Sequence, residues 1–112
     1  MLIHFISWFF GGMFLANAVP HGVSGLMGRA FQSPFAKPPG VGLSSSSANV
    51  LWASINLIVA WLLILDVGAF DLRAPIDAAA LGFGALLMSF LLARYFGRLH
   101  GGDNPEGPRQ GS

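Results

Sequence analysis

The sequence VLWASINLIVAWLLILDV, residues 50–67, has one charged residue, Asp66, and contains neither proline nor glycine. As an α-helix it would extend ~27 Å, close to the ~30 Å hydrocarbon thickness of a bilayer. Backbone N–H and C=O groups need internal hydrogen-bond partners in lipid, so this run predicts a membrane-spanning helix. One of the serines 44–47 is expected to cap its N-terminus.

Two further apolar runs lie on either side of it, at residues 2–19 and 75–97. Pro75 suits the first position of a helix, and Asp77 in the first turn suits the helix dipole. The sequence therefore predicts an all-α integral membrane protein. In this prediction residues 1–100 form a single membrane domain with three transmembrane helices.

The segments around these spans carry predictions of their own. Residues 68–74 form a short connection, so we expect the second and third spans to form an antiparallel helical hairpin. Gly68 suits the position just after a helix. The alternative for residues 2–19 is a secretory signal peptide, because Ala16-Asn17-Ala18 resembles a cleavage site. That alternative requires a basic N-terminal region, which the sequence lacks.

Composition limits the class of partner. Of the 112 residues, 54% are hydrophobic and 10% are charged, whereas soluble domains carry roughly 25% charged residues. A net charge of +1 cannot neutralise a run of phosphates, so we expect membrane lipids around the chain and no nucleic-acid partner. The chain has no cysteine, which excludes disulfides and thiolate metal sites.

Basic residues predict the orientation of the spans. With three spans, the 20–49 connection lies on the same side of the membrane as the C-terminus. That side carries Arg29, Lys37, Arg94, Arg98 and Arg109, and the other side carries only Arg73. Because cytoplasmic segments are enriched in Lys and Arg, we expect a multi-pass protein whose 20–49 connection lies in the cytoplasm. Its N-terminus would be outside and its C-terminus cytoplasmic.

The 20–49 connection is partly amphipathic. Its apolar residues Val23, Leu26, Met27, Ala30 and Phe31 are spaced as on one face of a helix. This spacing predicts an interfacial amphipathic helix over about residues 22–33, directly after Pro20. Residues 101–112 are rich in Gly, Pro and polar side chains, and they are predicted to form a disordered polar tail.

Polar side chains in or beside the spans are costly, so they are candidates for a ligand site or an interface. The candidates are Asn17, His21, Arg29 and Asn56. Asn17, His21 and Arg29 would form a polar site at the inner membrane interface. The alternative is structural: Asn17 satisfies carbonyl groups freed by Pro20, and Asn56 hydrogen-bonds between helices.

The sequence predicts no catalytic residue, no metal site and no cofactor. His4 and His21 would be ~25 Å apart on one helix, too far to share a metal ion. Gly22-Val23-Ser24-Gly25 lacks the final glycine of a nucleophile elbow, and the first acidic residue is Asp66.

Small residues at helical spacing predict where helices pack closely, because they let backbones approach. On the third span they are Ala78, Gly82, Ala85, Ser89, Ala93 and Gly97, and on the first span they are the pairs Ser7–Gly11 and Gly12–Ala16. The spacing leaves open whether the neighbour is a helix of the same chain, a second copy or another membrane protein.

The chain carries Asn17-x-x-Pro20-His21, followed by Pro34-Phe35-Ala36 and Asn49-Val50-Leu51-Trp52. This arrangement resembles a set of small uncharacterised bacterial integral-membrane proteins with the same Asn-x-x-Pro-His loop and Asn-Val-Leu-Trp helix start. The resemblance covers residues 17–56. It implies a protein of the bacterial cell inner membrane, and it implies no activity, ligand or partner.

The absence of a catalytic pattern and the small-residue faces favour a non-catalytic accessory or assembly subunit of a larger membrane complex. One alternative is a homo-oligomeric small transporter or channel lined by Asn17, His21 and Asn56. A third hypothesis is an enzyme acting on lipid head groups, in which Arg29 holds a phosphate and His21 moves a proton.

Overall fold

The computed structural model describes residues 2–107 and is mostly helical, at 69%. The elements are α1 (Leu2–Leu26), β1 (Phe31–Gln32), β2 (Leu43–Ser44), α2 (Ser46–Trp61), η1 (Leu62–Val67, a π-helical continuation of α2) and α3 (Pro75–His100). Three helices, Leu2–Leu26, Ser46–Val67 and Pro75–His100, are long and apolar enough to cross a membrane. In the predicted disordered tail, residues 101–107 form turns, and 108–112 lie outside the described residues.

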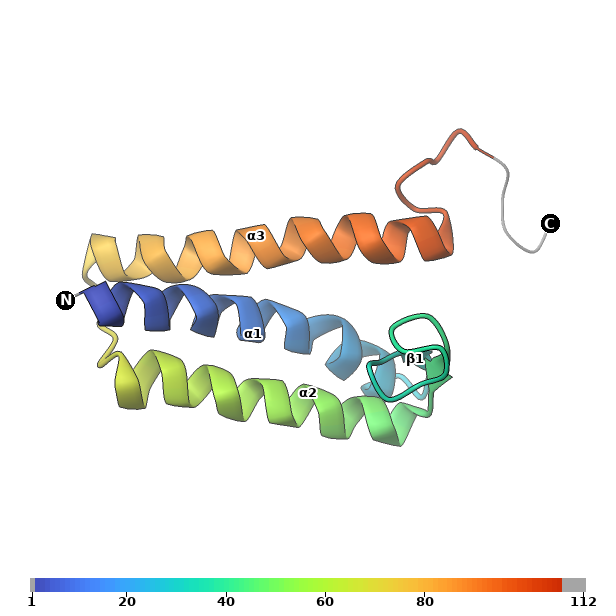
Figure 1. The fold of residues 1–112 in the computed structure, drawn as a ribbon, viewed down its shortest axis with the longest axis horizontal. Coiled ribbons are helices and arrows are strands. Elements are labelled where there is room, and N and C mark those ends of the chain that lie inside the picture. Colours follow the sequence, from blue (N-terminus) through green and yellow to red (C-terminus); the bar gives the residue numbers. More distant parts are fainter. Residues whose placement is uncertain (1, 108–112) are drawn as a thin grey trace.

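The first helix lies between the other two (Figure 1). α1 packs against both α2 and α3, and it runs antiparallel to α2 and parallel to α3. The bundle is accordingly flat, with principal extents of 51 × 31 × 22 Å. The second and third spans are antiparallel, as expected. They do not form the packed hairpin that the short connection suggested, because α1 separates them.

Small residues on two faces of α1 explain its central position. Towards η1, the Ser7 hydroxyl donates a hydrogen bond to the Leu63 carbonyl, and Gly11 packs on the same turn. Towards α3, Gly12 lies so close that a β-carbon would overlap the Leu81 carbonyl. Each face therefore admits the backbone of one neighbouring helix.

The third helix approaches α1 through Gly84, where a β-carbon would overlap the Phe9 carbonyl. Gly84 is the buried residue of α3. The outer faces of this helix expose large apolar side chains, including Phe83, Leu86 and Phe90. This distribution is typical of a helix that contacts its bundle on one side and lipid on the others.

The turn between η1 and α3 is shaped by Trp8, whose indole packs directly on Gly68. The left-handed conformation that favours glycine just after a helix is adopted by the next residue, Ala69, which has φ +49°. Gly68 itself keeps a right-handed backbone with φ −84°. A side chain at position 68 would collide with the indole, so close packing accounts for this glycine. Pro75 lies in the first turn of α3, as predicted.

The separate interfacial helix predicted over residues 22–33 is not confirmed. α1 continues through Pro20 as far as Leu26, so residues 22–26 are its last turns. The apolar spacing that suggested a helix ends in a different element, the strand β1 at Phe31–Gln32.

A glycine stops α1 at this point. Gly28 has φ +72°, a left-handed conformation that favours glycine. The N–H of Gly28 donates to the Gly25 carbonyl at 3.0 Å, and the N–H of Arg29 donates to the Ser24 carbonyl at 2.8 Å. These two bonds form a Schellman cap, which satisfies the last carbonyl groups and turns the chain away from the helix axis.

Beyond the cap, the loop folds back over the end of the bundle (Figure 1). β1 and β2 pair antiparallel, with Phe31 opposite Ser44. On the α3 side, the Tyr95 hydroxyl donates to the Gly40 carbonyl at 2.8 Å. Ser45 caps α2, as expected for one of the serines 44–47, by accepting from the Ala48 N–H at 3.1 Å.

Candidate functional site

Two polar side chains of α1 face two of α2 at the end of the bundle covered by the loop. Asn17 Nδ2 donates to Asn56 Oδ1 at 2.9 Å, and His21 Nδ1 lies 2.7 Å from Asn49 Oδ1. Asn49 and Asn56 are fully buried, and His21 is 3% exposed. The fold therefore joins Asn17, His21 and Asn56 with Asn49 in one polar cluster.

Backbone carbonyl groups fix the orientation of both amides on α2. Asn56 Nδ2 donates to the Trp52 carbonyl at 2.8 Å, so Asn56 Oδ1 is left to accept from Asn17. Asn49 Nδ2 donates to the carbonyls of Phe31, Ser44 and Ser45 at 3.0, 3.2 and 3.1 Å. Its Oδ1 is thereby left to accept from His21.

This order of donors fixes the tautomer of His21. Because Asn49 Oδ1 accepts, the proton of the neutral imidazole lies on Nδ1. Nε2 then holds a lone pair, and no hydrogen bond joins it to another residue of the range 2–107. Asn17 uses its Nδ2 towards α2, so its Oδ1 is likewise unpartnered within the described chain. The cluster thus has two free acceptor atoms.

Aromatic rings surround the imidazole. Its centroid lies 5.6 Å from Phe31, 6.4 Å from Trp52 and 6.2 Å from Phe96, each ring in an edge-to-face arrangement. These rings come from β1, α2 and α3, so the loop and all three helices meet at His21. The Trp52 indole N–H is buried and has no partner in the described part of the chain.

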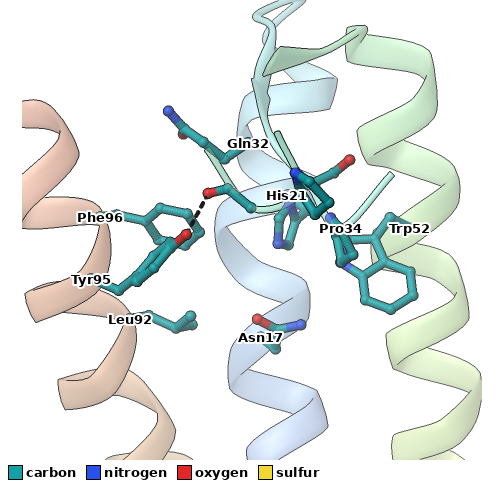
Figure 2. Close-up of a pocket in the computed structure, with 11 residues that line it drawn as sticks. Asn17, His21, Gln32, Pro34, Trp52, Leu92, Tyr95 and Phe96 are labelled. Carbon is teal, nitrogen blue, oxygen red and sulfur yellow. Dashed lines mark hydrogen bonds between the residues drawn. The ribbon is translucent and has the colours of Figure 1, made fainter. Parts of the chain in front are cut away.

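A cavity of about 400 Å³ adjoins the cluster (Figure 2). Its lining comes from Asn17 and His21 of α1, Trp52 of α2, Leu92, Tyr95 and Phe96 of α3, and loop residues 32–34 and 39–40. A volume of this size is typical of small-molecule sites. The lining combines polar but uncharged side chains, among them Asn17, His21 and Gln32, with apolar and aromatic ones.

Arg29, predicted to join Asn17 and His21, lies elsewhere. It is exposed, and it neither lines the cavity nor bonds to the cluster. The cap at Gly28 turns the chain before this residue, so Arg29 no longer shares the helix face of His21.

The small residues predicted for packing on α3 fall into several environments. Ala78 and Ala85 are half-buried, Ala85 beside Gly12, whereas Gly82, Ser89 and Ala93 are exposed and Gly97 lies against Asp103. The closest approach to α1 is made by Gly84, which the chosen spacing of four did not include.

Asn49 and Gln32 belong to the site although neither is among the predicted site residues. Asn49 lies in the first turn of α2, where asparagine is ordinary, and its spacing of seven from Asn56 is the signal that places both on one helix face. Gln32 Oε1 lies 3.0 Å from His100 Nε2. This contact joins β1 to α3, and no local pattern predicts it.

The arrangement can form hydrogen bonds to a neutral group held between aromatic walls. Among residues 2–107, no group of three or more His, Asp, Glu or Cys side chains is placed to hold a metal ion. His4 lies at the other end of α1, stacked on Trp8 with ring centroids 5.9 Å apart.

Comparison with protein-family models, with curated proteins and with solved structures gave no match to this chain. The class of protein is therefore defined by the fold and the site themselves. The chain is a small helical protein with three helices able to cross a membrane, consistent with a multi-pass membrane protein. It carries an uncharged polar cluster and an aromatic cavity at one end of its bundle.

Proposed function

We propose that the protein is a non-catalytic accessory or assembly subunit that packs against a larger complex in the bacterial inner membrane. In this proposal the N-terminus is outside and the C-terminus is cytoplasmic, following the distribution of basic residues. The partner is another membrane protein, and lipid covers the remaining apolar surface.

A second cavity, an open groove of about 460 Å³ between α1 and α3, is the observation that supports this proposal. Its lining includes Ala16 and Val19 of α1 and Ser89 and Ala93 of α3. Ser89 and Ala93 are exposed, and the Ser89 hydroxyl is satisfied by the Ala85 carbonyl of its own helix at 2.7 Å. An apolar groove with small residues admits the side chains of a helix from another chain.

The test is native mass spectrometry of the protein extracted gently from its host into nanodiscs. We expect a foreign membrane protein at fixed stoichiometry with the wild-type chain. Ser89→Leu fills the groove and should release that protein. Ala79→Leu makes a similar small-to-large change at an exposed position of α3 outside the groove, and should retain it.

Two outcomes would count against this function. Retention of the foreign chain by Ser89→Leu at the wild-type level would remove the groove as the contact. A closed homo-oligomer without a foreign chain would favour the transporter hypothesis instead.

The two alternative functions have less support. Asn17, His21 and Asn56, the residues suggested for a transport path, are engaged in hydrogen bonds within one chain. The enzyme hypothesis needs Arg29 to hold a phosphate beside His21, and Arg29 is exposed outside the cluster. Packing against a partner requires neither arrangement.

A further inference from the structure

We propose that the cavity beside the polar cluster binds the head of a neutral, hydroxyl-bearing amphiphile, a phenol or a lipid alcohol. The ligand hydroxyl donates its hydrogen bond to His21 Nε2, and the apolar body of the ligand lies between Trp52 and Phe96. This proposal does not rest on the packing function: Ala16 and Val19 line the groove and not the cavity, whereas Leu92 and Phe96 line both.

The unpartnered acceptor of His21 determines the hydrogen-bonding character of the ligand. His21 is 3% exposed, and Nε2 has no partner within residues 2–107. Nε2 keeps some exposed surface, unlike the buried and unpartnered Trp52 indole N–H, and His21 lines the cavity, so a ligand there can reach this atom. A ligand carbonyl would meet a second acceptor here, since the proton of the neutral ring is on Nδ1. The group that fits is a donor, an O–H or an N–H.

Asn17 strengthens this requirement. Its free Oδ1 lies one helical turn from His21 on the same face of α1, and both residues line the cavity. In Figure 2, Asn17 and His21 face the space between α2 and α3 below the loop. A ligand with two donor groups, such as a dihydroxy aromatic ring, can satisfy both acceptors at once.

The lining also excludes charged ligands. None of the residues that line the cavity is Asp, Glu, Lys or Arg. An ammonium or a phosphate bound there would lose its water without gaining a counter-ion, which is a large cost in an apolar environment. A neutral hydroxyl can enter with a much smaller loss of solvation.

The walls indicate that the rest of the ligand is apolar and flat. Trp52, Leu92 and Phe96 line opposite sides of the cavity, and Pro34 lies in the loop above it (Figure 2). Aromatic rings pack favourably against flat apolar groups. A polar donor at one end and an apolar body at the other together define an amphiphile.

The test compares two probes that share a body and differ in the donor, 2-naphthol and 2-methoxynaphthalene. The full chain, with ¹⁵N-labelled histidine, is studied in nanodiscs, and empty nanodiscs give the concentration of each probe in lipid. We expect 2-naphthol to shift the His21 Nε2 resonance saturably, leaving His4 and His100 unchanged. At equal lipid concentration it should bind at least tenfold more tightly than 2-methoxynaphthalene.

Two variants locate the binding. Leu92→Trp narrows the cavity and replaces no residue of the polar cluster, and it should weaken 2-naphthol binding at least tenfold while the His21 Nδ1 resonance stays in place. Ser54→Ala, at an exposed position of α2, should leave the affinity unchanged. Equal affinity for the two probes, or no saturable shift of His21 Nε2, overturns the proposal. So does binding that Leu92→Trp leaves intact.

Discussion

The side chain of Asn49 takes part in four hydrogen bonds although it is completely buried. Its amide nitrogen donates to carbonyl groups at the start of β1 and just before α2, and its oxygen orients His21. One side chain thus ties the loop to the bundle and sets the tautomer in the candidate site. The local sequence does not predict this role, because the carbonyl groups come from separate segments.

Replacing Asn49 should therefore cost far more than replacing an exposed polar residue. Asn49→Leu leaves buried carbonyl groups without a donor, so we expect the free energy of unfolding to fall by about 3 kcal/mol or more. Ser54→Ala, which removes only a bond to the Val50 carbonyl of the same helix, should change it by less than about 0.5 kcal/mol. Reversible unfolding in mixed micelles measures both values, and similar losses for the two variants would contradict the central role of Asn49.

At the scale of the elements, the positions of the helices along the sequence could be predicted. Which helices pack against one another could not. Apolar runs long enough for a bilayer identify each span, and local chemistry identifies the cap at Ser45 and the proline at the start of α3. Which helix packs on which depends on glycines that only three-dimensional contact distinguishes. Gly82 and Gly84 are near neighbours in sequence, yet Gly84 touches α1 and Gly82 is open.

These two glycines provide a matched pair of substitutions. Gly84→Ala places a methyl group against the Phe9 carbonyl, and such overpacking should lower the free energy of unfolding by about 1–3 kcal/mol. Gly82→Ala meets nothing within 4 Å, and the better helix propensity of alanine should raise stability by up to about 1 kcal/mol. The same unfolding titration compares them. Equal effects, or the reverse order, would argue against the close approach of α1 and α3.

Over the whole molecule, most of the buried polar side chains lie towards one end. The loop, the cluster and the cavity lie where α1 ends and α2 begins, whereas the opposite end is packed around Trp8. Apolar spacing alone could not show that residues 22–33 do not form a separate interfacial helix. That spacing is satisfied equally by the last turns of α1 followed by a strand, and the outcome depends on the backbone at Gly28.

Introduced cysteines can test the order of the helices, because the chain contains none of its own. A β-carbon at Gly22 would lie 3.4 Å from that of Ala53, close to the Cβ spacing of a disulfide. Gly22→Cys with Ala53→Cys should therefore oxidise readily to an intramolecular disulfide, seen as a mobility shift that a reductant reverses. Ala53→Cys with Ala93→Cys pairs α2 with α3 and should stay reduced. A disulfide in this second pair would mean that α1 does not separate those helices.

The central place of α1 also bears on how the protein is made. The ribosome synthesises α1 before α2 and α3, so the helix that contacts both others enters the membrane ahead of them. Helices that are independently stable in lipid associate after insertion. Each later helix can thus dock on a surface that is already present, α2 on one flank and α3 on the other. The bundle can assemble by adding one helix after another, and no packed pair of helices has to separate first.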